Sequence, residues 1–168
     1  MEIRESEARM ASKNIDRDPA ELHGVTFFKR TETVMNTKRR VLLVEDNEST
    51  IDVVVMELKY LGYEVTIAKD GQQALDRVAE EVPDLVIMDI QLPKMDGFAA
   101  VRQIRANPAV RDIPILAATA KALRGDEEKC LAVGCDGYIA KPFNHRQLEV
   151  AINRALKCRR GNLDAQGR

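Results

Sequence analysis

Residues 85–97 read Leu85-Val86-Ile87-Met88-Asp89-Ile90-Gln91-Leu92-Pro93-Lys94-Met95-Asp96-Gly97. The first four residues form a short apolar run typical of a buried strand, and an acid, Asp89, follows it directly. The residues after Asp89 predict a turn that opens a helix. Parallel α/β sheets bind their ligands at the carboxyl ends of their strands. This stretch therefore predicts an α/β fold with Asp89 at the edge where chemistry takes place.

Two more apolar runs end in charged residues in the same way. Residues 41–44 are followed by Glu45 and Asp46, and residues 138–140 are followed by Lys141 and Pro142. Because the carboxyl ends of parallel strands converge on one crevice, we expect these acids and the lysine to meet. The bond before a proline is the kind that can be cis, and a cis bond at Lys141–Pro142 would aim the lysine inward.

Strand and helix patterns alternate from residue 40 onward. Strands are expected at residues 40–44, 63–68, 84–88, 113–118 and 137–140. Apolar residues at helical spacing predict five helices, near residues 51–61, 71–82, 98–106 and 126–133 and after Asn144. Five such units predict a doubly wound, five-stranded parallel sheet in the order 2-1-3-4-5, of the flavodoxin-like kind, with helices on both faces.

Composition limits the function classes. The chain has 168 residues, 45% of them hydrophobic, and a net charge of -1, which argues against a bulk basic nucleic-acid binder. Its apolar runs are shorter than a membrane span, and its N-terminus lacks the apolar core of a signal peptide. A cytoplasmic location without membrane contact is the expectation. The cysteines, Cys130, Cys135 and Cys158, match no zinc pattern and are expected to be reduced thiols.

Three regions are expected along the chain. Residues 1–37 have no persistent apolar period and are interpreted as a flexible N-terminal extension, with Met35 as a possible start of the domain. Residues 38–158 would form the folded domain. Residues 159–168 would form a polar C-terminal tail. Because this tail is too short for an output domain, we expect a stand-alone domain that binds no DNA directly and acts through protein contacts.

The crowded acids point to a cation. Two carboxylates ~4 Å apart repel by about 4 kcal/mol at an effective dielectric near 20. A hard divalent ion with oxygen ligands offsets that repulsion, and Mg²⁺ is the usual choice where phosphate chemistry follows. Each of Glu45, Asp46 and Asp89 alone is more often a solvated loop residue. All three, each just after an apolar strand, favour a metal site.

Three other residues could take part in phosphate chemistry. Lys141 can pair with a phosphoryl oxygen or with Asp89 itself. The hydroxyl of Thr119, after the fourth strand, could donate to a phosphoryl oxygen or could cap a helix, and its position alone favours neither role. Tyr138 precedes Lys141 in the fifth strand, where most tyrosines are simply half-buried sheet residues.

With these residues in view, the chain resembles the receiver domain of bacterial two-component response regulators, of the single-domain CheY and DivK type. The resemblance covers residues 38–158 and rests on Val44-Glu45-Asp46-Asn47, on Met88 through Gly97, on Ala118-Thr119-Ala120 and on Tyr138-Ile139-Ala140-Lys141-Pro142. It implies that Asp89 accepts a phosphoryl group from a histidine kinase or a histidine phosphotransfer protein. It also implies Mg²⁺ held by Asp46, by Asp89, by Glu45 through water and by the backbone carbonyl of Gln91.

The resemblance further implies how the signal would be passed on. Thr119 and Lys141 would contact the phosphoryl oxygens, and Tyr138 would turn inward when Thr119 moves. The face formed by the fourth helix, fifth strand and fifth helix would bind a downstream protein. Two departures from the usual pattern, Gln91 and Lys121, bear on the lifetime of the phosphorylated state.

Our interpretation is therefore a phosphorylation switch. It would be no enzyme in the ordinary sense, because it assists only its own phosphorylation and dephosphorylation. One alternative is a Mg²⁺-dependent aspartyl-phosphate hydrolase, although Gln91 stands where such enzymes carry a second Asp. The other is an adaptor that works without phosphate, which the presence of Asp89, Lys141 and the acid pair disfavours.

Overall fold

The computed structural model describes residues 38–120 and 126–166, with side chains described for 38–120 and 127–158. The chain separates into Met1–Met35 and Asn36–Arg168, and every described residue belongs to the second unit. The predicted extension, residues 1–37, therefore lies outside the described residues, as does Lys121. Its boundary stays a prediction.

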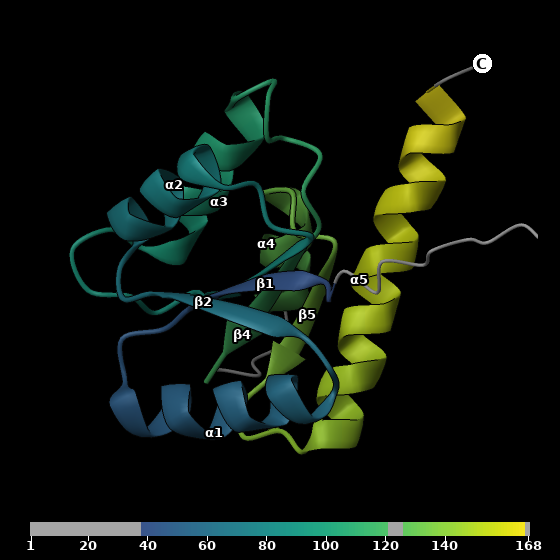
Figure 1. The fold of residues 1–168 in the computed structure, drawn as a ribbon. Helices are drawn as coiled ribbons and strands as arrows, with labels where there is room; N and C mark the ends of the chain where they lie inside the picture. The colour runs from purple at the N-terminus through teal and green to yellow at the C-terminus, as the bar shows by residue number, and fades with distance from the viewer. Residues whose placement is uncertain (1–37, 121–125, 167–168) are drawn as a thin grey trace, which may run out of the picture. The chain divides into compact units, whose positions relative to one another are not determined.

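Strands and helices alternate throughout the described residues (Figure 1). In chain order they are β1 (Arg40–Val44), α1 (Glu48–Tyr60), β2 (Glu64–Ala68), α2 (Gly71–Glu80), β3 (Leu85–Asp89), α3 (Gly97–Ala106), β4 (Ile115–Thr119), α4 (Asp126–Ala132), β5 (Gly137–Ala140) and α5 (His145–Gln166). The strands form one parallel sheet in the order β2-β1-β3-β4-β5. The predicted fold class is confirmed.

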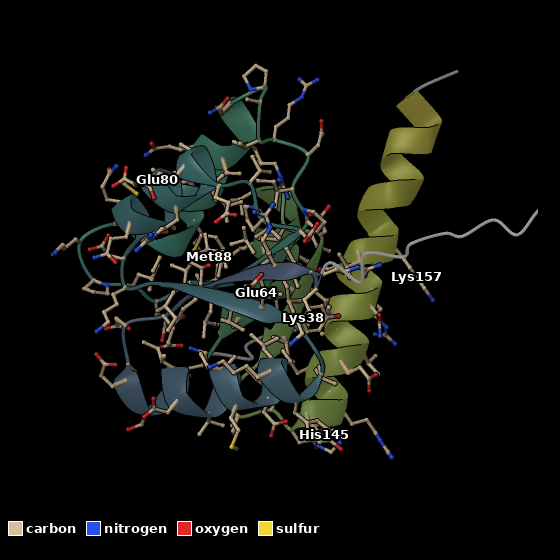
Figure 2. All side chains as sticks on the ribbon, in the orientation of Figure 1. Lys38, Glu64, Glu80, Met88, His145 and Lys157 are labelled. Atoms are coloured by element: carbon tan, nitrogen blue, oxygen red, sulfur yellow. The ribbon has the colours of Figure 1, made fainter. Side chains whose placement is uncertain are left out.

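The sheet separates two apolar cores, because alternate residues of each strand point to opposite faces. On one face, side chains from α1 and α5 pack over Val41, Leu43, Leu85 and Ile87. On the other face, α2, α3 and α4 pack over the residues between them, including the fully buried Met88. Figure 1 shows α1 across the sheet from α2 and α3, and Figure 2 shows Met88 in the interior with Glu80 at the outside of α2.

Polar caps fix where the helices begin at the carboxyl edge of the sheet. Asn47, Asp70 and Asp96 accept the backbone N–H three residues ahead at 3.0, 2.8 and 3.1 Å, at the starts of α1, α2 and α3. Asn144 and Gln147 cap α5 reciprocally, each side chain accepting the other's backbone N–H. Such caps satisfy otherwise unpaired donors of the first turn, so each loop at this edge has a defined end.

At the opposite end of the strands, Arg105 of α3 holds together the segments that lead into β4 and β5. Its guanidinium donates to the carbonyl oxygens of Gly134 (2.7 Å), Arg111 (2.7 Å) and Ile113 (2.8 Å) and pairs with Asp136 at 2.8 Å. The same Asp136 oxygen accepts the N–H of Ile115 at 2.9 Å. Nothing in the spacing of the sequence predicts this cluster, which ties α3 to the amino ends of β4 and β5.

Several element boundaries differ from the sequence prediction, and Asp89 and Thr119 end β3 and β4 rather than following them. Helix α2 ends at Glu80, so Val82 lies beyond it and is 48% exposed, whereas the apolar spacing places Val82 on the helix. Helix α5 continues through Arg159 to Gln166, into the segment interpreted as a tail. Polar composition alone does not end a helix: Arg159, Arg160 and Gln166 are good helix formers, and no proline interrupts this segment, although Gly161 lies within it. Among the described residues, no helix has the length and apolar character needed to cross a membrane.

Candidate functional site

Strand alternation brings three charged residues together at the carboxyl edge. Every second residue of β1 and β3 faces the α1 and α5 side, and the next positions in that alternation are Glu45 and Asp89. In β5, Ile139 faces the same side, and Lys141 stands two residues further on. On this face of the sheet, the residues within each strand are apolar and buried, and the residue at the carboxyl end is charged.

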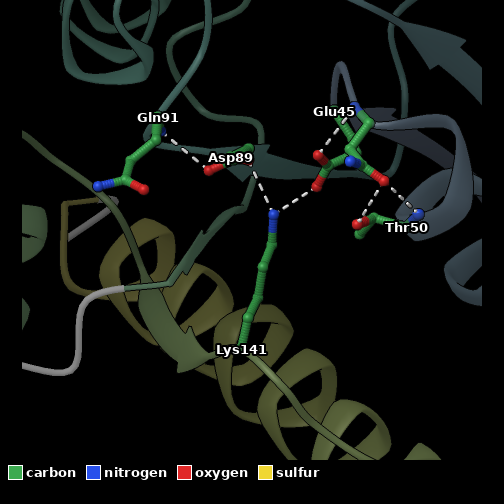
Figure 3. Close-up of polar contacts among 6 residues, drawn as sticks. Glu45, Thr50, Asp89, Gln91 and Lys141 are labelled. Atoms are coloured by element: carbon green, nitrogen blue, oxygen red, sulfur yellow. Dashed lines mark hydrogen bonds and ion pairs between the residues drawn. The ribbon is translucent and has the colours of Figure 1, made fainter.

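Asp89 is held by a hydrogen bond on each oxygen. Its Oδ1 accepts the backbone N–H of Gln91 at 2.9 Å, and its Oδ2 lies 2.8 Å from Lys141 Nζ (Figure 3). Lys141 also pairs with Glu45, whose other oxygen accepts the N–H of Asn47 at 3.2 Å. Glu45 and Asp89 are only 3% and 6% exposed, so these contacts compensate carboxylates that have lost most of their water.

The charge on Lys141 is secured by its partners. Burial alone would lower the pKa of this ammonium, but the hydrogen bonds and charges of Asp89 and Glu45 outweigh burial and raise the pKa above its usual value. Lys141 therefore stays protonated at neutral pH. The Lys141–Pro142 peptide bond is cis, the form that the sequence analysis considered.

The acids form a cluster that fits a hard cation. Glu45, Asp46 and Asp89 each offer an oxygen, and these atoms lie within 4.8 Å of one another. Glu45 and Asp89 are buried, whereas Asp46 is exposed to solvent, which leaves an approach from outside. Carboxylate oxygens without nitrogen or sulfur ligands suit Mg²⁺ rather than softer metals. The residues present therefore fit the predicted metal, and their roles as ligands stay predictions.

A glycine lets the following loop fold back onto Asp89. The N–H of Gly97 donates to the carbonyl of Ile90 at 3.1 Å, which closes the β3–α3 loop at its base. A Cβ atom at Gly97 would overlap the carbonyl oxygen of Asp89 and lie 2.8 Å from the Cα of Ile90. Only glycine fits this close approach. Asp96 thus caps α3, and the next residue must be glycine because a side chain there would collide with the backbone of Asp89 and Ile90.

Thr119 and Tyr138 lie on the other face of the sheet. Thr119 continues the series of Ile115 and Ala117, which belongs to the α2, α3 and α4 side, and it is 4% exposed. Tyr138 pairs with Ala117 in the β4–β5 register and packs, half-buried, against the same core. The two predicted switch residues are thus diagonal neighbours on one face: Thr119 pairs with Ala140, and Tyr138 pairs with Ala117.

Sequence analysis missed contacts that support the site. Asp70 and Gly71, at the start of α2, touch Lys94 and Met95 of the β3–α3 loop. The only signal for them was the cap motif at Asp70, which says nothing about a partner 24 residues away. The side chain of Gln91 is exposed and extends away from Lys141 (Figure 3), whereas its N–H donates to Asp89.

Comparison with known proteins places this geometry in a family. Residues 41–153 match the sequence profile of the response regulator receiver domain. The chain belongs to that family. The predicted resemblance is thereby confirmed, and the chain contains a receiver domain of the two-component signalling systems.

Individual relatives of this receiver domain differ in length. It is 39% identical to the polar-differentiation response regulator DivK of Brucella anthropi over 106 residues, which cover 63% of this chain and 86% of DivK. It is 37% identical over 123 residues to a probable transcriptional regulator, ycf27, of Guillardia theta, where the match covers 73% of this chain and 47% of the relative. The chain thus spans about half of that longer protein.

A solved structure of similar fold is the receiver domain of the sensor histidine kinase PA1611 from Pseudomonas aeruginosa. It is 42% identical, has a TM-score of 0.67 and covers 71% of this chain and 98% of that domain. That structure has a magnesium ion coordinated in its active-site cleft. The PA1611 receiver domain therefore holds the metal that the acid cluster here fits.

Proposed function

We propose that this receiver domain is a stand-alone phosphorylation switch, in which Asp89 accepts a phosphoryl group from a phosphohistidine donor. The observation that carries the proposal is the placement of Asp89 between the Lys141 ammonium and the two acids Glu45 and Asp46. A buried nucleophilic carboxylate next to a fixed cation and a cation-binding cluster suits phosphoryl transfer, which depends on positioning and on neutralising charge.

The chemical step balances without further reactants. An oxygen of Asp89 forms a bond to phosphorus as the bond from phosphorus to the donor's imidazole nitrogen breaks, and that nitrogen takes up a proton. Lys141, already 2.8 Å from Asp89 Oδ2, would transfer its hydrogen bond to a phosphoryl oxygen. Attack by water on phosphorus later breaks the bond to the Asp89 oxygen, which releases inorganic phosphate and restores the carboxylate. The protein assists only these two reactions and has no other substrate.

Mg²⁺ belongs to this proposal. Glu45, Asp46 and Asp89, with the backbone carbonyl of Gln91, would hold it. When bound, it supplies positive charge to the phosphoryl oxygens. The chain's own part is to keep the acids close together and Asp89 oriented, which the contacts of Asp89 with the Gln91 N–H and Lys141 do.

The switch would run from Thr119 to Tyr138. A phosphoryl group on Asp89 offers a new acceptor for the Thr119 hydroxyl, and movement of Thr119 toward it would vacate space on the face that Tyr138 shares. Phosphorylation would thus favour one of two packings of the same core. Tyr138 also lines a groove of about 630 Å³ between α4, β5 and α5, so its rotation would alter that surface.

We assign the downstream partner to this groove. Leu131 and Val150, 50% and 45% exposed, offer apolar contacts, and Arg146 and Arg154 line the same surface. A partner segment with apolar anchors flanked by acids complements this combination. Tyr138 connects the groove to the core, so a partner seated there would distinguish the two packings.

The hydrolase alternative has less support. Such an enzyme would need a second acid where Gln91 stands, and the exposed Gln91 side chain extends away from Asp89 and Lys141. Burying the Lys141–Asp89 ion pair beside an acid cluster costs free energy, because both charges lose their water. An adaptor that works without phosphate would gain nothing from these buried charges to offset that cost.

Intact-protein mass spectrometry tests the proposal. The protein is incubated with acetyl phosphate and MgCl₂, with or without a chelator, and the phosphorylated residue is mapped. We expect one phosphate on Asp89, dependent on Mg²⁺ and released by hydroxylamine, as an acyl phosphate should be. Asp89→Asn should abolish it, while Asp52→Asn, which alters an exposed acid on α1, should leave it unchanged.

Two results would overturn the proposal. The first is an undiminished adduct in Asp89→Asn or in the presence of the chelator. The second is multiple-turnover hydrolysis of p-nitrophenyl phosphate by the wild type, lost in Asp89→Asn, which would establish the hydrolase instead.

A further inference from the structure

The β3–α3 loop, residues 90–96, is held at two separate places. Its base is closed by the hydrogen bond from Gly97 N–H to Ile90 and by the close approach of Gly97 to the Asp89 carbonyl. Its tip, Lys94 and Met95, contacts the first residues of α2. A loop fixed only at its base could still rotate about it, so the tip contact determines where the middle of the loop lies.

Met95 makes the apolar contact of the loop tip. A Cβ atom added to Gly71 would lie 2.9 Å from Met95 Cγ and 3.0 Å from its Sδ, so the methionine side chain rests directly on the glycine backbone. Met95 is partly buried and packs against the core on the α2, α3 and α4 side. Any side chain larger than hydrogen at position 71 would displace it.

Lys94 adds a polar contact beside Met95. Its Nζ lies 3.5 Å from Oδ2 of Asp70, the residue that caps α2. The N–H of Gln73 lowers the pKa of Asp70 against the effect of burial, and Lys94 lowers it further, so this carboxylate is ionised at neutral pH. Because the Lys94 side chain is 81% exposed, the ion pair contributes little to stability. Lys94 has φ +67°, a conformation uncommon for residues other than glycine, which its surroundings must maintain.

Gln91 lies between the two anchors of the loop. Its N–H donates to Asp89 Oδ1 at 2.9 Å, and its carbonyl is the predicted metal ligand of the loop. Pro93 stiffens the segment between Gln91 and the tip, and the N–H of Met95 closes a tight turn on the Pro93 carbonyl at 2.8 Å. A displacement of Met95 would therefore be transmitted to Gln91.

We propose that Met95, seated on Gly71 at the start of α2, is a positioning residue that holds Gln91 against Asp89 and thereby sets the affinity of the acid cluster for Mg²⁺. The metal part of this inference rests on the proposed function. The positioning part does not, because it concerns only the hydrogen bond from the Gln91 N–H to Asp89 Oδ1, which involves protein atoms alone. Side chains that orient ligands from outside the coordination shell commonly change metal affinity when they are replaced.

The test uses three variants of the full chain. Met95→Ala removes the contact, and Met95→Leu keeps its volume. Leu75→Ala is the matched control, since Leu75 belongs to α2, is partly buried and packs on the same core as Met95. For each protein, NMR measures hydrogen exchange of the Gln91 amide without metal, titration measures the dissociation constant for Mg²⁺, and urea denaturation measures stability.

We expect Met95→Ala to speed Gln91 exchange and to weaken Mg²⁺ binding by about tenfold, the lower end of effects seen for residues behind metal ligands. Leu75→Ala should lose similar stability with neither change, and Met95→Leu should resemble the wild type. Gly71→Ala, which displaces Met95 from the other side, should reproduce the effects of Met95→Ala.

Equal Gln91 exchange in Met95→Ala and Leu75→Ala would overturn the inference, because Met95 would then be an ordinary packing residue. So would unchanged Mg²⁺ affinity in a Met95→Ala protein of reduced stability. If the wild type takes up no Mg²⁺ at all, the proposed function fails, and the metal-free exchange rates still decide whether Met95 positions Gln91.

Discussion

Lys141 Nζ lies 2.8 Å from Asp89 Oδ2 although β4 separates their two strands in the sheet. The lysine side chain extends past the end of β4 and also reaches Glu45, which follows β1. One ammonium thus joins the carboxyl ends of three strands. Its positive charge holds the two buried carboxylates of Glu45 and Asp89 close to each other.

Lys141→Met should destabilise the protein in the presence of a chelator by about 3–5 kcal/mol, because Glu45 and Asp89 would remain buried without a counter-charge. MgCl₂ should restore part of this loss, since a cation that binds the native state stabilises it. Urea denaturation with chelator and with MgCl₂ measures both effects. Lys69→Met is the control, because Lys69 pairs with Glu48 on the surface and should matter little. A Lys141→Met protein as stable as the wild type in chelator would contradict the argument.

Thr119→Ala should separate phosphorylation from signalling. The variant should still accept phosphate at Asp89, but phosphorylation should change its affinity for the partner by less than it does in the wild type, because the hydroxyl that moves is missing. Thr119→Ser keeps the hydroxyl and should behave like the wild type. The measurement is the ratio of partner affinities with and without phosphate. A wild-type ratio in Thr119→Ala would place the switch elsewhere.

Gly97→Ala should destabilise the protein by about 3 kcal/mol or more, since its Cβ would force apart the backbone at Asp89 and Ile90. Gly62→Ala provides a comparison: Gly62 has φ +87° but open space around it, so only conformational strain of about 1–2 kcal/mol is expected there. Urea denaturation gives both values. Similar losses in the two variants would mean that the close approach at Gly97 relaxes easily.

The three thiols should differ in reactivity. Cys158 is exposed, whereas Cys130 and Cys135 are buried, so a thiol reagent at pH 8 should modify one cysteine quickly and the other two only on unfolding. Burial raises the pKa of Cys135 to about 12 from 9.0. The unfolded chain therefore loses this proton at lower pH than the folded protein, and stability should fall as pH rises above about 9. Cys135→Ala should reduce that slope, and two fast thiols in the native protein would contradict the burial.

A chain that begins at Met35 should still be phosphorylated at Asp89, because every residue assigned to the site lies in Asn36–Arg168. The rate of acetyl phosphate uptake, compared with that of the full chain, checks this expectation. Loss of cooperative unfolding in the shortened chain would show that the predicted domain boundary is wrong.

The sequence predicts the site residues because they follow a local rule. Glu45, Asp89 and Lys141 each come at or just after the end of an apolar strand, and parallel strands bring such ends together. Both the sheet order and the convergence follow from short-range patterns combined with the handedness of βαβ connections. Pattern alone could therefore name the three charged residues that the structure brings into contact.

Contacts between side chains of distant segments leave no such pattern. The pairing of Arg105 with Asp136, and the seating of Met95 on Gly71, depend on how helices pack over the sheet rather than on spacing. Val82 gives a second example of what spacing cannot predict. Its spacing matches the apolar residues of α2, but the helix ends before it. Periodicity reports which face a residue prefers and does not report where an element stops.

Because of the Arg105 cluster, the two ends of the strands β4 and β5 differ in how firmly they are held. At the amino ends of β4 and β5, one guanidinium binds three carbonyl oxygens and a carboxylate that is itself held by Ile115. At the carboxyl ends, the corresponding loops carry the site. Lys141 links the carboxyl ends, but a phosphoryl group on Asp89 would alter that link, whereas those contacts of Arg105 do not involve Asp89. Structural change on phosphorylation should therefore be largest at the carboxyl ends of the strands and smallest around Arg105.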